Sequence, residues 1–291
     1  MHLVIGANGR VGRLVTQELI NAGEKPRVFV RSAKKTTERF GNQVDTVVGD
    51  LNDPATIEEA MKNASSVFLC SPIDPDQVRQ QNQVVDAASR AEAYLVKVSG
   101  LATFPGSFVD SGRWHAMTEQ HMAQTEISGT CLHPFFFMQN MDFQLPGIRR
   151  DGVLKSAVTQ AAIAMVDTGD IAAVAAKLML NPDLAMGQTL PLTCSEALSY
   201  EQMASEMSEV FGHTVRFETQ NPQQVAANLR QSGMPDWHIN VILQFNRAFN
   251  EGLGSKVHPH VQDILGRPAV SFRQYLETAT ISVDDANPFP S

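Results

Sequence analysis

The sequence is poor in the residues that build disulfide frameworks and metal centres. Its 291 residues include three cysteines, Cys70, Cys131 and Cys194, which lie far apart along the chain. Paired cysteines at fixed spacings mark disulfide-rich domains and zinc sites, and neither pattern occurs here. His258 and His260 flank a proline with no carboxylate pair nearby, so we expect no metal site.

Long apolar runs and positive charge are also lacking. No segment approaches the ~20 apolar residues that a membrane helix needs, and the formal net charge is -8. Nucleic acids and anionic membranes are bound by clustered lysine and arginine, so we expect neither as a partner. A hydrophobic content of 43% with 19% charged residues is typical of a globular protein. We expect a cytoplasmic protein, whose oligomeric state stays open, a homodimer included.

Short apolar runs alternate with longer amphipathic segments over the first 133 residues. Expected strands cover residues 3–5, 27–31, 45–49, 66–70, 94–99 and 129–133, and expected helices cover 11–22, 54–62, 75–91 and 113–126. Nearly every strand lacks polar alternation, which indicates a parallel sheet buried on both faces. Right-handed crossovers then predict an α/β fold, a Rossmann-type doubly wound sheet with ligands at the carboxyl ends of its strands.

The run "LVIGANGRVGRL" contains three glycines, Gly6, Gly9 and Gly12, between a buried strand and a helix. In the dinucleotide fingerprint, the first glycine allows a tight turn and the second allows close approach of a pyrophosphate. The third lets helix and strand pack closely, and the phosphates lie at the helix N-terminus. A glycine turn without a ligand is the alternative. Strand, glycines, helix and second strand in the expected order favour a bound dinucleotide.

The second strand indicates which dinucleotide is bound. An NAD site usually has Asp or Glu at its end, where it binds the ribose hydroxyls. Here "VFVRSAKK" places Arg31 at that point, with Lys34 and Lys35 behind it. A guanidinium pairs with a 2′-phosphate, and Arg10 in the glycine loop could add a second cation. The pattern therefore favours NADPH over NADH, although the two lysines could also form a solvated basic face.

After Pro134 the pattern changes to helices expected at 167–180, 199–212, 222–232 and 236–250, with strands at 187–193 and 214–219. We expect residues 1–150 to form an NADP-binding Rossmann domain. Residues 151–285 are expected to form a smaller, mostly helical region for a substrate or partner, from which the chain could cross back to the sheet. The last residues, 286–291, are expected to be a flexible tail.

The runs "GANGRVG", "FVRS" and "GDLNDPATIEEAMKNASSVFLCSP" resemble the NmrA-like branch of the atypical short-chain dehydrogenases. The branch includes NADPH-dependent quinone, azo-dye and triphenylmethane reductases and NADP-sensing regulators. "KVSG", "HAMTE", "CLHPFFFMQN" and "VDTGDIA" extend the resemblance over nearly the whole chain. The cofactor contacts that it implies are Gly6, Asn8, Gly9, Arg10, Val11 and Gly12 at the phosphates, Arg31 at the 2′-phosphate, Asp50 and Leu51 at the adenine, Cys70, Ser71 and Pro72 at the nicotinamide ribose, and Ser99 near the nicotinamide. Cys70 could instead be a small buried packing residue.

The proton donor of ordinary short-chain dehydrogenases, a tyrosine with a lysine four residues later, is missing. None of the three tyrosines has a lysine at that spacing. The corresponding segment reads "SGRWHAMTEQHM", in which His115 and Glu119 share a face if it is helical. His115 could protonate an acceptor while NADPH supplies hydride, and a packing or capping role is the alternative. For Glu119 we expect a structural hydrogen bond near the end of the sheet.

The resemblance places "PFFFMQN" over the nicotinamide, where its apolar side chains would form a flat surface suited to aromatic substrates. A buried core strand is the alternative interpretation. His133 stands where the branch usually has arginine. The residues expected to contact the substrate are Phe135, Phe136, Met138 and Trp237.

These features favour an NADPH-dependent reductase of a small quinone-like, dye-like or other conjugated aromatic molecule. An acceptor of this kind takes up hydride without a strong proton donor, which fits the missing tyrosine. The competing hypothesis is a non-enzymatic NADP(H) sensor that binds a regulatory protein. A third, a sugar-nucleotide epimerase, is disfavoured by the missing tyrosine–lysine pair.

Overall fold

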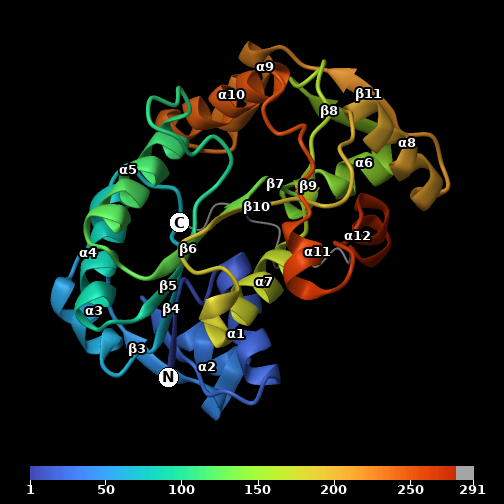
Figure 1. Ribbon diagram of the computed structural model, residues 1–291. Helices are drawn as coiled ribbons and strands as arrows, with labels where there is room; N and C mark the ends of the chain where they lie inside the picture. The colour runs from blue at the N-terminus through green and yellow to red at the C-terminus, as the bar shows by residue number, and fades with distance from the viewer. Residues whose placement is uncertain (280–291) are drawn as a thin grey trace.

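The computed structural model describes residues 1–279, so the tail expected at 286–291 lies outside the described residues. A seven-stranded sheet has the order β10-β6-β5-β4-β1-β2-β3, and each of its neighbouring pairs is parallel. This confirms the doubly wound α/β fold (Figure 1). Its strands are β1 (His2–Ile5), β2 (Arg27–Val30), β3 (Asp45–Val48), β4 (Ser66–Leu69), β5 (Tyr94–Val98), β6 (Gly129–Pro134) and β10 (Thr189–Leu192).

Helices cover both faces of this sheet (Figure 1). One face carries α1 (Arg10–Asn21), α2 (Lys34–Phe40) and α7 (Thr168–Leu180), and the other carries α3 (Pro54–Met61), α4 (Gln77–Arg90) and α5 (Asp110–Gln124). Successive strand residues point to opposite faces. Val4 therefore packs in the core with α1 and α7, while Leu3 and Ile5 pack in the core with α3 and α4. Burial on both faces explains the apolar runs of the sequence.

The chain crosses back to the sheet after residue 150. Helix α7 packs on α1, and β10 pairs with β6 at the edge of the sheet. A boundary at residue 150 therefore does not separate the sheet from the remaining elements. Asp167 begins α7, because its carboxylate accepts the Gly169 N–H at 2.7 Å.

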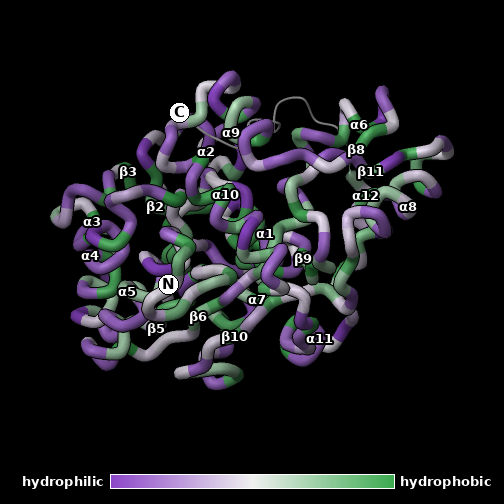
Figure 2. Tube along the Cα trace, turned by 90° about the horizontal axis from the view of Figure 1, so that it is seen from above, coloured by the Kyte–Doolittle hydropathy of each residue, from purple (hydrophilic) through white to green (hydrophobic). Residues whose placement is uncertain are grey.

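The remaining elements form a second layer of mostly short helices, which Figure 1 shows on the side of α7 and above α5. This layer contains two small pairs of parallel strands, β7 with β9 and β8 with β11. Apolar residues of this layer, such as Leu154, Met203 and Phe272, are buried in the main hydrophobic core. Figure 2 colours the whole chain by hydropathy, with hydrophobic residues in green. The elements are α6 (Leu145–Asp151), α8 (Tyr200–Phe211), α9 (Pro222–Gln231), α10 (Asp236–Asn250), α11 (His260–Leu265), α12 (Phe272–Thr278), β7 (Phe136–Phe137), β8 (Val153–Ser156), β9 (Met165–Val166), β11 (Arg216–Thr219) and the 3-10 turn η2 (Met138–Met141). Two further 3-10 turns belong to the main sheet: η1 (Gly41–Gln43) joins α2 to β3, and η3 (Pro182–Leu184) joins α7 to β10.

Helix α5 begins at Asp110, three residues earlier than the sequence predicts. The Asp110 N–H donates to the Gln244 side-chain oxygen at 2.9 Å, and the Gln244 amide donates back to the Asp110 carboxylate at 3.0 Å. The partner lies on α10, far along the chain, so local sequence patterns do not show it. Within residues 1–279, no helix has both the length and the apolar character to cross a membrane.

Candidate active site

The three glycines of the loop after β1 have different structural roles. Gly6 has φ +88, and a Cβ there would lie 2.1 Å from the Cys70 carbonyl oxygen. A Cβ on Gly12 would lie 2.1 Å from the Gly6 oxygen, so both positions admit only glycine. A Cβ on Gly9 would have one neighbour within 4 Å, the Gly6 oxygen at 3.2 Å. Protein packing alone does not require glycine at Gly9, whereas a pyrophosphate approaching the loop would.

Helix α1 presents an uncapped N-terminus to the same space. Gly9 is its N-cap and contributes no side chain, and the first turn contains no acidic residue. The first N–H groups of a helix, here including that of Val11, lack intrahelical acceptors and favour an anion. The Arg10 guanidinium contacts the carboxylate of Asp142. Arg10 is therefore paired in this structure rather than free to act as a second cation.

Exposed cations lie beside this loop. Asn8 links the loop to α2, because Thr36 Oγ1 donates to Asn8 Oδ1 at 3.0 Å. Arg31, in the turn after β2, and Lys34 and Lys35, at the start of α2, are exposed, and within the described chain none of the three forms an ion pair. Unpaired cations next to a phosphate cradle are what the expected 2′-phosphate contact requires.

The other expected cofactor residues lie at the carboxyl ends of their strands. Asp50 and Leu51 follow β3, and the Asp50 carboxylate accepts the N–H of residue 52 at 2.7 Å. Ser71 and the exposed Pro72 follow β4, and Gln81 Nε2 donates to Ser71 Oγ at 2.9 Å. Burial raises the pKa of the adjacent Cys70 thiol to about 11, so it is protonated at neutral pH. The packing alternative describes this cysteine better than a reactive thiol does.

A cluster of buried polar groups occupies the end of β5. Lys97 lies on β5 and Ser99 directly follows the strand, two residues further on, so both side chains point to the same face, toward α4 and α5. Lys97 is 0% exposed, and its Nζ donates to Ser99 Oγ at 2.6 Å and lies 3.1 Å from His115 Nδ1. Ser99 donates to the Glu119 carboxylate, which also lies 2.8 Å from His133 Nε2. Ser99 and His115, predicted separately from the sequence, thus belong to one network.

Sequence reasoning missed the centre of this network. Lys97 stands within "YLVKVS", an otherwise apolar strand that the sequence predicts to be buried on both faces. A lysine in such a strand was the available signal, because charged side chains are almost never fully buried without partners. Gln77, at the start of α4, was missed as well. It is 0% exposed, and its Nε2 lies 2.9 Å from His115 Nδ1.

The cluster fixes the charge state of its histidine. Burial, and then the charges of Lys97 and His133, hold the pKa of His115 well below its usual value. Burial also lowers the pKa of Lys97, against an opposing influence of its neighbours Cys131, Glu119 and Cys70. His115 is therefore a neutral imidazole at neutral pH. When Lys97 is protonated its ammonium only donates, so His115 Nδ1 then accepts and the ring proton lies on Nε2.

Glu119 makes the structural hydrogen bonds that the sequence predicts. Burial acts to raise its pKa, but the hydrogen bond and charge of His133, the Lys97 charge and the Ser99 hydrogen bond outweigh burial, and the pKa lies below its usual value. Glu119 is therefore ionised at neutral pH. His133 contacts this carboxylate, so its ring is held inside the network.

The expected apolar wall is divided between two places. Phe136 packs edge-on against Phe249, near the end of α10, with centroids 5.9 Å apart. Trp237, at the start of α10, packs 6.3 Å from Trp114, the residue before His115. Phe249 lies twelve positions after Trp237, a separation of about 18 Å along the helix. Trp237 and Phe136 therefore lie too far apart to contact the same part of a substrate. Trp114 is an aromatic neighbour that the sequence did not single out.

Two further residues of the expected wall lie elsewhere. Met138 is 0% exposed and belongs to the main hydrophobic core. It therefore offers no surface to a substrate, and the expectation of a substrate contact at Met138 is replaced by a packing role. Phe135 packs edge-on against the His258 ring at 5.7 Å. The alternative of a core strand thus holds for part of "PFFFMQN".

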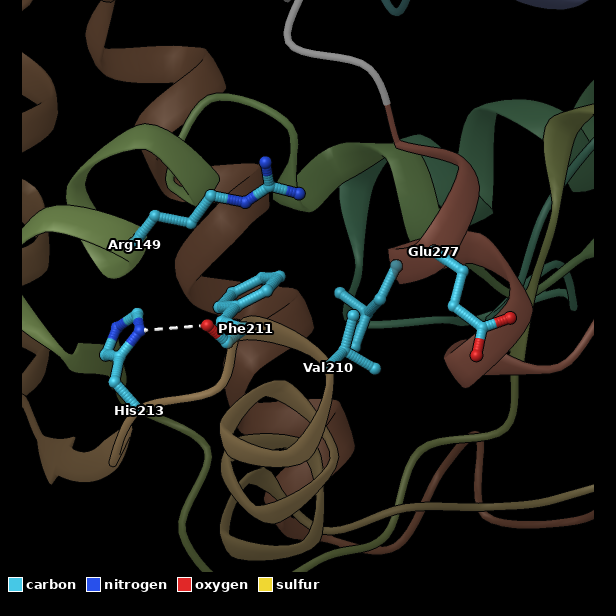
Figure 3. Close-up of a pocket in the computed structure, with 6 residues that line it drawn as sticks. Arg149, Val210, Phe211, His213 and Glu277 are labelled. Carbon is cyan, nitrogen blue, oxygen red and sulfur yellow. Dashed lines mark hydrogen bonds between the residues drawn. The ribbon is translucent and has the colours of Figure 1, made fainter.

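A concavity outside this region lies between α6, α8 and α12 (Figure 3). The Arg149 guanidinium lies 4.6 Å above the Phe211 ring on one side of it. Glu277 lies on the opposite side in the view of Figure 3. None of the residues expected to contact cofactor or substrate lines this concavity. The candidate active site is therefore the carboxyl edge of the main sheet.

Comparisons with known proteins agree with this geometry. The NmrA-like family matches residues 2–265. The chain is 29% identical over 276 residues to an NAD(P)H azoreductase of Xenophilus azovorans, covering 94% of this chain and 96% of that protein. It is 30% identical over 276 residues to a (4-alkanoyl-5-oxo-2,5-dihydrofuran-3-yl)methyl phosphate reductase of Streptomyces griseus, with 94% and 96% covered. The triphenylmethane reductase of Citrobacter sp., in complex with NADP(H), shares the fold with a TM-score of 0.86 at 21% identity, covering 96% of this chain and 100% of that chain.

Proposed function

The chain belongs to the NmrA-like family, and we propose that it is an NADPH-dependent reductase of a conjugated aromatic acceptor, such as a quinone or a dye. That the protein is an NAD(P)H-dependent oxidoreductase rests on the two relatives at about 30% identity over nearly the whole chain, both of which are named reductases. The class of acceptor is the more specific part of the proposal.

One observation carries the cofactor assignment. The uncapped N-terminus of α1 lies beside a turn whose exposed cations have no ionic partner within residues 1–279. The Gly9 position and the N–H groups behind it would hold the pyrophosphate. Arg31, with Lys34 and Lys35, would bind the 2′-phosphate that distinguishes NADPH from NADH. When bound, NADPH supplies the hydride.

The chain's own residues would orient the acceptor and assist its protonation. β4 adjoins β1 and β5 adjoins β4, so the Ser99–His115 cluster would lie at the same carboxyl edge of the sheet as the expected nicotinamide position. His115 presents an Nε2–H group, which can donate to an oxygen or nitrogen that becomes negative as the acceptor is reduced. Trp114 precedes His115 on α5 and packs on Trp237, and the two rings would offer aromatic surface for a planar acceptor.

The relatives' names support this acceptor class. An azo compound, a triphenylmethane dye and an acylated dihydrofuranone all have a conjugated π system. A group of this kind delocalises the charge that arrives with a hydride, so the enzyme needs no strong acid. The absence of the tyrosine–lysine pair fits this requirement.

The absence of that pair also favours a second candidate, an NADP(H)-binding sensor without turnover. Purified protein with NADPH and a panel of quinones, azo dyes, triphenylmethane dyes and iminium compounds distinguishes the two. We expect NADPH oxidation with at least one of these classes. Tight NADPH binding with no oxidation by any of them would favour the sensor.

A further inference from the structure

Lys97 is buried without a direct ionic partner. Its side chain is 0% exposed, and no carboxylate within the described chain lies close enough to its Nζ to form an ion pair. Its two acceptors are the neutral groups Ser99 Oγ, at 2.6 Å, and His115 Nδ1, at 3.1 Å. A buried ammonium with only neutral partners is costly, and an apolar side chain would fill the same space more stably. Packing therefore does not account for this lysine.

The groups that face Lys97 come from every element around it. Cys70 follows β4, Cys131 pairs with Lys97 across β5 and β6, and His115 and Glu119 face it from α5. The amide nitrogen of Gln77, on α4, lies 2.9 Å from the same His115 Nδ1 and 3.4 Å from His115 Nε2, so its shorter contact is with Nδ1. Two N–H donors, from Lys97 and Gln77, thus converge on one ring nitrogen. This arrangement holds the His115 proton on Nε2, away from the lysine.

We propose that Lys97 is a positioning residue that acts through His115 and supplies the proton that the reduced acceptor takes up. The inference rests on the proposed function, because the acceptor needs a proton only after it has received a hydride. Lys97, His115 and the acceptor atom would form a straight relay with the imidazole in the middle.

The transfer balances without any further reactant. The acceptor atom, negative after hydride addition, forms a bond to the proton of His115 Nε2, and the Nε2–H bond breaks. The ring takes a proton at Nδ1 from the Lys97 ammonium, whose N–H bond breaks. The products are a neutral reduced acceptor, a neutral Lys97 amine and a neutral His115 with its proton on Nδ1.

A hydrogen-bonded path returns the proton from solvent. Ser99 connects Lys97 to Glu119, and Glu119 connects to His133. The side chains of Glu119 and His133 are 21% and 14% exposed, so the far end of the path reaches water. Burial keeps the pKa of Lys97 below its usual value, which makes its ammonium a better proton source.

The tautomer of His115 gives a test that needs no turnover. In the cofactor-free protein with 15N-labelled histidine, we expect the NMR shifts of His115 to report a protonated Nε2 and an unprotonated Nδ1. The substitution Lys97→Met removes one of the two donors to Nδ1 and should introduce the other tautomer. A wild-type ring with its proton on Nδ1 would overturn the relay.

Steady-state kinetics of Lys97 variants test the proton relay separately from the proposed reductase activity. For Lys97→Met we expect kcat to fall on the order of a hundred-fold, as for loss of a general acid, with NADPH affinity within about two-fold. Wild-type kcat should fall as the pH rises through the lowered pKa of Lys97. This falling limb of the kcat–pH profile should be absent from Lys97→Met. Lys97→Arg keeps a charge that does not titrate in this range, and it should restore folding but not the limb. Lys62→Met, at the exposed C-terminus of α3, is the matched control and should behave as wild type.

Each outcome of this experiment decides one of the claims. An active wild type whose Lys97→Met variant keeps the same kcat and pH profile overturns the relay alone. A wild type that binds NADPH and reduces no acceptor overturns the proposed function, and the relay with it. If Lys97→Met does not fold, the same comparison is made with Lys97→Gln, which keeps a neutral donor and should also lose the pH limb.

Discussion

The Arg10 guanidinium in the glycine loop contacts the carboxylate of Asp142, 132 residues further along the chain. The other oxygen of this carboxylate accepts the hydroxyl of Tyr275, on α12, at 2.6 Å. Tyr275 is 3% exposed. The last described helix is therefore tied through one carboxylate to the loop that we expect to hold the cofactor phosphates.

This link predicts that Tyr275→Phe destabilises the cofactor-free protein. Asp142 keeps its pairing with Arg10 but loses one hydrogen bond, and a bond to a charged, partly exposed group contributes about 1 kcal/mol. Urea unfolding of the two proteins measures the difference. Unchanged stability would show that Tyr275 contributes only its apolar ring.

Asp142→Asn should release Arg10 and increase NADPH affinity, because it removes a negative charge beside the phosphates.

Replacing Arg31 should remove most of the preference for NADPH. A charge-assisted contact to phosphate is worth roughly 1.5–3 kcal/mol, so Arg31→Ala should lower the NADPH/NADH affinity ratio about ten- to a hundred-fold. Fluorescence titration with each cofactor measures the ratio. Arg39→Ala, an exposed cation in the last turn of α2, is the control and should keep it. Equal wild-type affinity for both cofactors would refute the 2′-phosphate assignment.

The three glycines should respond differently to substitution. Gly12→Ala places a Cβ 2.1 Å from a backbone oxygen, so it should lower the melting temperature of the cofactor-free protein. Gly9→Val should leave that temperature nearly unchanged while abolishing NADPH binding, because its side chain would occupy the pyrophosphate position. Thermal melting with and without NADPH separates these effects. Normal NADPH binding by Gly9→Val would mean that the glycines serve only the turn.

The lowered pKa of His115 predicts a loss of stability in acid. Above about pH 6.5 the ring is neutral in the folded and unfolded chains, and its contribution is present in full. Below that pH, the unfolded chain binds a proton that the folded chain does not. The free energy of unfolding then falls by at most about 1.4 kcal/mol per pH unit for this group.

Urea unfolding between about pH 7 and 5 tests this sign by comparing wild type with His115→Asn. The variant should lose less stability over that interval. His2, His238 and His258, whose pKa values are also lowered by burial, remain in both proteins and cancel in the comparison. Parallel pH profiles would show that His115 titrates normally in the folded state.

The divided aromatic wall predicts different outcomes for its two parts. Trp237→Ala should raise KM for an aromatic acceptor several-fold without changing NADPH affinity, since it packs on Trp114, the residue before His115. Phe136→Ala removes a ring packed on Phe249 and should also lower the melting temperature. Steady-state kinetics and thermal melting measure both. Equal loss of stability in the two variants would make Trp237 a packing residue.

Local patterns in the sequence were sufficient for the sheet and the glycine loop. The central strands β1, β4 and β5 are buried and read as largely apolar runs, whereas the edge strand β3 is mostly exposed. Gly6 and Gly9 lie between β1 and α1, and Gly12 lies in the first turn of α1, as the fingerprint requires. The position of Arg31 follows from the end of β2 alone. Each of these features depends on residues close together in the chain.

The centre of the candidate site depends on contacts that no local pattern shows. Lys97 meets His115 because α5 packs over β5, and Trp114 meets Trp237 because α10 packs against α5. The sequence shows Lys97 only as an interruption in an apolar strand. Met138 and Phe136 share one apolar run, and tertiary packing alone assigns the first to the core.

Hydride transfer from NADPH to a conjugated acceptor is the central claim, and an isotope label tests it most directly. NADPH carrying deuterium at both C4 positions of the nicotinamide is mixed with the protein and a triphenylmethane dye, whose reduced carbon does not exchange with water. Mass spectrometry of the product should show the deuterium on that carbon, with one NADPH oxidised per dye reduced. Bound but unoxidised NADPH with this dye and with the rest of the acceptor panel, or a reduced dye without deuterium, would contradict the account.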